Sequence, residues 1–454
     1  MQLDPILRVP LDHVPLPQMY PATVRFPADC VADIGAAVQD ALTAGSILTR
    51  LRPGMRVAVA VGSRGVAEVA DVVRAAVAAL RHARVEPFIV PAMGSHGGAT
   101  AQGQQEVLAE LGITEEAVGA PIRASMEVVE LARLPQGVPV CMDRHAYEAD
   151  ATLLVNRVKP HTDFRGPIES GLAKMCVIGL GKIRTAEAVH AHGPAGLRDL
   201  MPQAARLVVE KGRVIGGLAV LENAYHQVAE IVGVPPAGIG REAEAALLTR
   251  ARALMPSLPF ARLDVLLVEE MGKNVSGAGM DTNIIGRMWV PGMPEPERPQ
   301  INAIVVLGLT EATRGNAAGL GLADVITARL LTAINWDDTL VNALTSGVVA
   351  LWRMKIPWVA PDDAAAIRLA LRLCGRPDPE NALLVRIRNT LHLGEIWISE
   401  GLRPLARELP HVEVGDRPTP RRFLPDGRLE PMGYPIPEPS SSAGPFTSSR
   451  LAGR

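Results

Sequence analysis

Alternation between short valine-rich segments and longer alanine-rich segments is the feature that most constrains the fold of this chain. In the first half, the valine-rich segments have the length and residue types of buried strands. They lie at 56–63, 86–93, 151–160 and 213–224. The segments between or after them carry apolar residues at helical spacing. The clearest of these helices are expected at 65–83, 101–112 and 241–255. Strands separated by helices of this length predict βαβ units and a mainly parallel sheet.

The alternation of strand-like and helix-like segments is repeated in the second half of the chain. Further members of it lie at 263–272, 301–310, 323–335 and 382–390. We therefore predict an α/β protein of two α/β domains with mainly parallel sheets and an active-site cleft between them. The expected boundaries are a cofactor-binding catalytic domain at 1–260, a second α/β domain at 261–415, and a Pro/Ser-rich extension and tail at 416–454.

Composition narrows the classes of function. Lys and Arg number 46 against 48 Asp and Glu, and aromatic residues make up only 3% of the chain. A nucleic-acid binder usually has a basic surplus and stacking aromatics, so we expect no nucleic-acid partner. No apolar run reaches the length of a membrane span. The four cysteines are far apart with no CxxC pair, which favours a reducing cytoplasm over a disulfide scaffold or structural zinc.

Two glycine-rich turns follow predicted strands. In the turn Gly62-Ser63-Arg64-Gly65, a guanidinium can grip a carboxylate or phosphate through two parallel hydrogen bonds. In 94–100, His96 is flanked by small residues that allow a ligand to approach the backbone. Ligands of open α/β sheets bind beyond the carboxyl ends of the strands, where both turns are expected. Each turn taken alone is also compatible with an ordinary solvated loop residue.

The segment 156–182 is the densest in charged residues and glycines. Lys174 lies in it among apolar neighbours, where partial desolvation would lower its pKa and make it nucleophilic. The alternative to a nucleophilic role is that Lys174 lies on a helix face and extends its ammonium group into solvent. Further along, one of His190 and His192 can supply a single metal ligand, but there is no HExxH motif or quartet of metal-binding side chains. Any metal would therefore need most of its ligands from another source.

The ordered set of these residues resembles the nickel-dependent lactate racemase family, whose members racemise or epimerise 2-hydroxy acids. The resemblance rests on Arg64, His96, His161 and Lys174, followed by His190 after a further 16 positions. It extends over about residues 50–195. The turn around Arg64 differs from the Asp-x-Thr-Arg-Pro turn of the family, so the identity of the 2-hydroxy acid stays open.

The resemblance implies a role for each residue. Lys174 would carry a covalently bound nickel-pincer nucleotide, and His190 would be the protein ligand of the nickel. His96 and His161 would be the acid–base pair, and Arg64 would hold the substrate carboxylate. Lys273, in the polar stretch 269–283, is the candidate for a second carboxylate-binding residue, with Arg287 as its rival. Expected cofactor-binding positions are Ser63, Gly62, Gly171 and Gly179.

The expected activity is inversion of C2 of a 2-hydroxy acid by removal and return of a hydride. The expected partners are this small substrate and cofactor-maturation proteins, with no nucleic acid and no membrane. Two other functions remain open at this point. One is a non-redox α/β module that binds a nucleotide or another anion, and the other is a lyase that uses Lys174 as a Schiff base.

Overall fold

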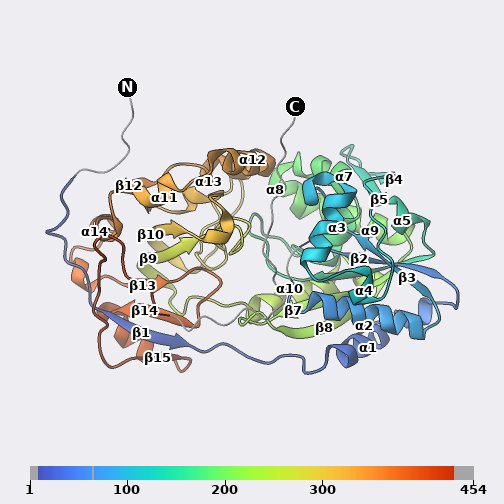
Figure 1. The fold of residues 1–454 in the computed structure, drawn as a ribbon, viewed down its shortest axis with the longest axis horizontal. Coiled ribbons are helices and arrows are strands. Elements are labelled where there is room, and N and C mark those ends of the chain that lie inside the picture. The colour runs from blue at the N-terminus through green and yellow to red at the C-terminus, as the bar shows by residue number, and fades with distance from the viewer. Residues whose placement is uncertain (1–8, 64–65, 434–454) are drawn as a thin grey trace. The chain divides into compact units, whose positions relative to one another are not determined.

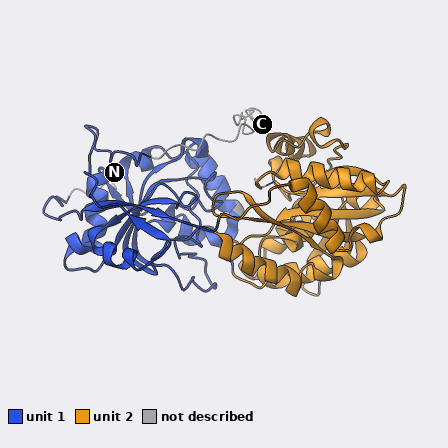
Figure 2. Cartoon of the chain, turned by 90° about the horizontal axis from the view of Figure 1, so that it is seen from below, with its two compact units in different colours: residues 1–27, 162–164, 256–435 blue, residues 28–161, 165–255, 436–454 orange. Residues whose placement is uncertain are grey.

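The structure is a computed structural model that describes residues 9–63 and 66–433. The chain forms two compact units, which Figure 2 shows in different colours. Of the described residues, unit 1 contains 9–27, 162–164 and 256–433, and unit 2 contains 28–63, 66–161 and 165–255. Both units are mixed α/β structures.

Unit 2 contains strands and helices in the alternating order that the sequence predicts (Figure 1). Its strands are β2 (Arg56–Val61), β3 (Glu86–Pro91), β4 (Val128–Arg133), β5 (Pro139–Asp143), β6 (Ala151–Arg157), β7 (Val214–Glu222) and β8 (Val228–Val234). Its helices are α1 (Ile34–Ala44), α2 (Val69–His82), α3 (Ala101–Glu110), α4 (Glu115–Val118), α5 (Arg144–Glu148), α6 (Leu172–Lys174), α7 (Lys182–His190), α8 (Gly193–Ala195), α9 (Met201–Lys211) and α10 (Glu242–Leu254).

Five of these strands form one sheet in the order β3-β2-β6-β7-β8. The pairs β2–β3, β2–β6 and β6–β7 are parallel, and only the edge strand β8 is antiparallel to its neighbour β7. This arrangement confirms the predicted mainly parallel sheet. Strands β4 and β5 pair separately as an antiparallel hairpin, which the alternation does not predict.

Alternate residues of the strands divide between the two faces of this sheet. Val57, Val59 and Val61 of β2 belong to one buried cluster with residues of α1 and α2, which lie side by side. Ala58 and Ala60, also fully buried, point to the other face. Burial of both faces explains why these strands are continuous apolar runs rather than alternating ones.

Unit 1 contains a second, larger sheet. Its strands are β1 (Met19–Val24), β9 (Arg262–Met271), β10 (Gln300–Leu309), β11 (Val325–Thr327), β12 (Trp358–Ala360), β13 (Leu384–Ile387), β14 (Glu395–Ser399) and β15 (Val412–Val414). Its helices are α11 (Ala328–Thr332), α12 (Trp336–Ser346), α13 (Ala350–Arg353), α14 (Asp363–Leu373) and α15 (Arg403–Arg407). The strand order is β12-β11-β10-β9-β13-β14-β1-β15.

The first five strands in that order are parallel, as predicted, whereas β14, β1 and β15 pair antiparallel. The expected boundary near residue 260 lies close to Pro256, where unit 1 resumes. Residues 9–27 differ from the expectation, because they belong to unit 1 rather than to the unit that follows them in the chain. The physical reason is that β1 hydrogen-bonds with β14 and β15, a long-range pairing that local patterns do not encode.

The start of the expected extension also packs on unit 1. Leu429 and Met432 are buried there, while the tail from residue 434 lies outside the described residues. Within the described ranges, no helix is both long enough and apolar enough to span a membrane. The cleft predicted between the two domains stays a prediction.

Candidate functional site

Three of the predicted site segments leave the same edge of the unit 2 sheet. Ser63 follows β2, His96 follows β3, and His161 follows β6. These strands are parallel neighbours in the order β3-β2-β6, so their carboxyl ends meet at one edge. This edge is where ligands bind in open α/β sheets. Arg64, the predicted carboxylate clamp, and Gly65 lie outside the described residues.

His96 lies on an exposed loop and contacts the neighbouring turn. Its Nδ1 and the Oγ of Ser63 form a hydrogen bond. The loop is tightly wound, because Gly94, Gly97 and Gly98 all have φ between 61° and 64°. Other residues adopt that left-handed conformation only at a cost, which explains the glycines on both sides of the histidine. The contact fixes one ring nitrogen of His96 and directs the other away from Ser63.

His161 and Lys174 form the second contact of the site. Lys174 Nζ lies 2.8 Å from His161 Nε2, and both side chains are half-buried. An ammonium has only donors, so Lys174 donates and His161 Nε2 accepts. If the lysine is an ammonium, this contact places the imidazole proton on Nδ1. The two residues that the resemblance assigns to cofactor attachment and to proton transfer are therefore direct neighbours.

Two buried carboxylates hold the backbone around this pair. Glu169 accepts hydrogen bonds from the backbone N–H of His161 (2.7 Å) and of Gly166 (3.1 Å), and it pairs with Arg252 at 2.5 Å. Its position fixes the loop that begins at His161. The sequence shows Glu169 only as one charge in a charged segment, so its burial was not predictable.

Glu244 is the second buried carboxylate, and it holds the backbone at the start of α6, the helix that contains Lys174. It accepts from the N–H of Ala173 (3.0 Å) and of Gly240 (2.9 Å), and thereby caps α6, which has no side-chain cap of its own. Burial raises the pKa of the Glu244 carboxyl. Gly171 is required here because a Cβ on it would lie 2.3 Å from Glu244 Oε1.

A π-helical turn, Met175–Gly179, follows directly after Lys174. Such turns are rare and occur often at functional sites. The N–H of Gly94 donates to the Gly179 carbonyl at 3.3 Å, so this turn contacts the His96 loop. A Cβ on Gly62 would lie 3.2 Å from Met175 Cε, which brings the Ser63 turn to the same helix. The structure therefore joins the Ser63, His96 and Lys174 segments.

The glycines predicted to bind a cofactor have packing roles. Gly171 and Gly179 are buried, and a Cβ on Gly179 would lie 2.7 Å from the Ala92 carbonyl oxygen. Protein atoms therefore already explain why these positions lack side chains. Contacts of these two glycines, of Gly62 and of Ser63 with a cofactor stay a prediction.

His190 is exposed at the end of α7. Its Nδ1 donates to the carbonyl oxygen of Ala186 at 2.6 Å, which holds the imidazole in one orientation. Metal-binding histidines are commonly held in one tautomer by such a hydrogen bond. Among the residues that the structure describes, no group of three or more His, Cys, Asp or Glu side chains could hold a metal ion. Binding of a metal by His190 therefore stays a prediction, and such a metal would need other ligands from outside this set of side chains.

In unit 1, Lys273 follows β9 at the carboxyl end of that strand. Its Nζ donates to the Gly277 carbonyl at 2.6 Å, and its N–H donates to Thr313 Oγ1 at 3.0 Å. Its rival Arg287 is only 8% exposed and pairs with Asp324 at 2.8 Å. This partly buried ion pair occupies the Arg287 guanidinium, so we keep Lys273 as the candidate for a substrate contact.

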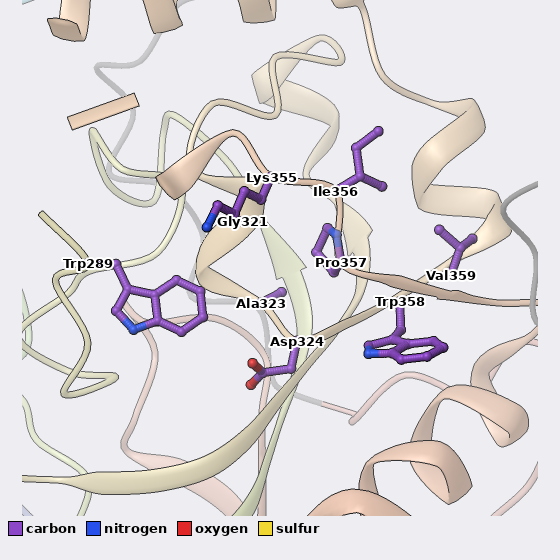
Figure 3. A pocket seen from close by; sticks show the side chains of 9 residues that line it. All are labelled: Trp289, Gly321, Ala323, Asp324, Lys355, Ile356, Pro357, Trp358 and Val359. Carbon is purple, nitrogen blue, oxygen red and sulfur yellow. The ribbon is translucent and has the colours of Figure 1, made fainter. Parts of the chain in front are cut away.

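A pocket of about 350 Å³ lies at the opposite edge of the unit 1 sheet (Figure 3). Its lining includes Trp289, Asp324, Lys355 and Trp358. Asp324 precedes β11 and Trp358 begins β12, so the pocket lies at the amino ends of these parallel strands. Ligand sites of such sheets lie at the carboxyl ends, and we therefore do not assign the chemistry to this pocket.

The fold and the site together define an α/β protein with a histidine–lysine site at the carboxyl edge of a parallel sheet. Residues 12–195 match the family model described as the lactate racemase N-terminal domain. This match confirms the resemblance to the lactate racemase family over residues 12–195 of the chain.

Two solved structures are similar to the chain at low identity. The lactate racemase apoprotein from Thermoanaerobacterium thermosaccharolyticum is 13% identical, with a TM-score of 0.46 over 80% of this chain and 95% of that one. A crystal structure of a protein from Thermotoga maritima is 15% identical, with a TM-score of 0.44 over 60% of this chain and 70% of that one. The comparison with curated protein sequences gave no match.

Proposed function

We propose that this protein is a racemase or epimerase that inverts C2 of a 2-hydroxy acid. The match to the lactate racemase N-terminal domain supports this class of activity. The observation that carries the proposal is the 2.8 Å contact between Lys174 and His161 at the sheet edge that also bears His96. Inversion through a planar keto acid needs a proton to leave and return to the hydroxyl oxygen on two sides of the substrate, and imidazole is a side chain suited to such transfer.

We further propose that a nickel-pincer nucleotide serves as the cofactor. Lys174 would attach it, and the lone pair of His190 Nε2 would bind its nickel. Ser63, Gly62, Gly171 and Gly179 would line its phosphate and ring. When bound, the group supplies an acceptor and donor of hydride. The protein would supply binding, orientation and proton transfer around it.

Hydride removal suits this substrate class for a chemical reason. The carboxylate makes the neighbouring carbon a poor acid, so direct removal of its proton is difficult. Loss of a hydride instead requires that the hydroxyl give up its proton at the same time. One of His96 and His161 would accept this proton, and the other would return a proton after the planar keto acid is attacked from its opposite face. Arg64 and Lys273 would hold the carboxylate and keep the keto acid in place.

The test of the proposed activity is a substrate panel. We expect the protein to act in the cytoplasm, so it would be produced there together with the cofactor-maturation proteins. The loaded protein would then be incubated with pure enantiomers of several 2-hydroxy acids. We expect loss of optical purity for at least one of them. Retention of optical purity across the panel by protein shown to contain nickel would contradict the proposed activity.

A lyase that forms a Schiff base on Lys174 is the second candidate, and the same lysine–histidine contact favours it. A neighbouring imidazole can accept a proton from the lysine and leave it nucleophilic. Borohydride reduction in the presence of a carbonyl substrate would then trap an adduct on Lys174. A third possibility, a non-redox module for nucleotides or other anions, predicts binding without turnover.

A further inference from the structure

A fully buried lysine lies next to the proposed site and takes no part in the chemistry described above. Lys182 begins α7 and is 0% exposed. Its Nζ donates to the carbonyl oxygen of Pro91 (2.5 Å) and to Gln104 Oε1 (2.8 Å), and it lies 3.2 Å from Asp143 Oδ2. Lysines are almost never fully buried unless they are paired, so this position calls for a specific explanation.

The backbone at this lysine is also unusual. Lys182 has a φ of 51°, in the left-handed region that favours glycine. A side chain with a branch-free stem can occupy that region only at a cost of roughly 1–2 kcal/mol. Burial lowers the pKa of Lys182 and raises that of Asp143, and the attraction between the two charges opposes both changes. A lysine at this position therefore lowers the stability of the fold through its backbone conformation and its buried charge. Packing alone does not explain why a lysine is present.

The partners of Lys182 lead directly to the His96 loop. The Gln104 amide has one oxygen and one nitrogen, and its oxygen faces the ammonium. Its Nε2 consequently faces the loop, where it donates to the carbonyl oxygens of Gly94 (2.9 Å) and His96 (3.3 Å). Since an ammonium can only donate, it selects this orientation of the amide over the flipped one. Pro91, the other acceptor, is the last residue of the strand that precedes the loop.

We propose that Lys182 is a positioning residue for His96. The ammonium fixes the Gln104 amide, the amide holds the backbone of Gly94 and His96, and the loop presents the imidazole to the site. Asp143 balances the buried charge. The inference rests on the proposed function of His96 as an acid–base group. Misplacement of a reacting group by about 1 Å can cost about 10²-fold in rate, so such a remote anchor can matter to turnover.

Two variants separate positioning from folding. The double substitution Lys182→Met with Asp143→Asn removes both charges together, so neither is left unpaired in the interior. Gln104→Met removes only the amide and leaves the lysine with Asp143 and Pro91. Lys211→Met is the matched control, because it makes the same change at an exposed lysine of unit 2.

The first readout needs no cofactor. Nitrogen-15 NMR of histidine-labelled protein reports the tautomer of His96 through its ring nitrogens, and a His96→Gln variant identifies those signals. We expect both test variants to change the His96 signals toward an average of the two tautomers, with the control unchanged. In loaded enzyme, we expect kcat to fall by about 10- to 100-fold with KM within about twofold of the original value.

Folded variants that keep both the His96 signals and kcat would overturn the proposal. If the double variant does not fold, Gln104→Met decides the question alone. If the unsubstituted protein racemises nothing, the proposed function fails, but the His96 signals still show whether Lys182 and Gln104 hold the imidazole. A fall in thermal stability with unchanged His96 signals would identify the network as purely structural and would also count against the proposal.

Discussion

At the scale of single residues, the site consists of side chains that the sequence marks and side chains that it does not. His96, His161 and Lys174 stand in glycine-rich or charged segments after strands, and the chemistry of these residue types made them candidates. Glu244 and Gln104 lie in helices where the sequence gives no sign of burial. Their role depends on which backbone groups the fold brings to them, and only the structure shows that.

We expect His96→Ala and His161→Ala each to lower racemisation by about 10²–10⁴-fold, the usual contribution of a general acid–base group. Chiral chromatography of product mixtures from cofactor-loaded protein would measure the effect. His82→Ala, which changes an exposed histidine of the same unit, serves as the control. Full turnover in either test variant would remove that histidine from the mechanism.

Lys174→Ala is expected to abolish covalent attachment of the cofactor, because it removes the amine that contacts His161. Intact-mass spectrometry of protein produced with the maturation proteins would show the adduct on the original chain and on a Lys211→Ala control. The same adduct on the Lys174 variant would refute the assignment.

At the scale of helices and strands, the alternation in the sequence located β2, β3, β6, β7, β9 and β10 to within a few residues. Those strands are buried and parallel, so their apolar runs are a strong local signal. The segment 323–335 instead divides into β11 and α11, because Thr327 caps a new helix by accepting from the N–H of Leu330. The antiparallel strands β1, β14 and β15 escaped prediction because their pairing joins distant parts of the chain.

The cap of α6 predicts a pH dependence of stability. Burial raises the pKa of Glu244 above 4.5, so the folded protein holds this proton more tightly than the unfolded chain does. The resulting stability is fully present below the unfolded pKa and is lost as pH rises through the folded pKa. Glu244→Gln keeps an acceptor but cannot ionise, so its free energy of unfolding should fall less over this range.

Urea unfolding at a series of pH values from about 4 to 8 would measure the difference. Glu242→Gln is the matched control, since Glu242 is exposed in the first turn of the same helix. Parallel pH profiles for the Glu244 variant and the original protein would show that Glu244 does not have a raised pKa.

At the scale of the whole molecule, two α/β units are built from a chain that passes from one unit to the other more than once. Residues 9–27 and the short segment Thr162–Phe164 both belong to unit 1. Within unit 1, Arg353 pairs with Asp163 at 2.7 Å and donates to the Thr162 carbonyl at 2.7 Å, which anchors that short segment. The sequence predicted two domains as continuous residue ranges, and such ranges cannot describe a unit that is built from separate segments of the chain.

Because β1 lies between β14 and β15, damage to it should affect unit 1 selectively. Ala22→Pro removes a backbone N–H from a strand that has neighbours on both sides. We expect hydrogen exchange in β14 and β15 to accelerate at least about tenfold while the unit 2 strands stay unchanged, since local units open separately. Equal acceleration in both units would show that they unfold together.

The most direct test of the proposed chemistry follows the hydrogen at C2. A substrate from the active panel, deuterated at C2, would be racemised in ordinary water and both enantiomers analysed by mass spectrometry. Removal and return of a hydride predicts that both enantiomers keep the deuterium. Replacement of the deuterium by solvent hydrogen in the inverted enantiomer would show proton abstraction and contradict the proposed mechanism.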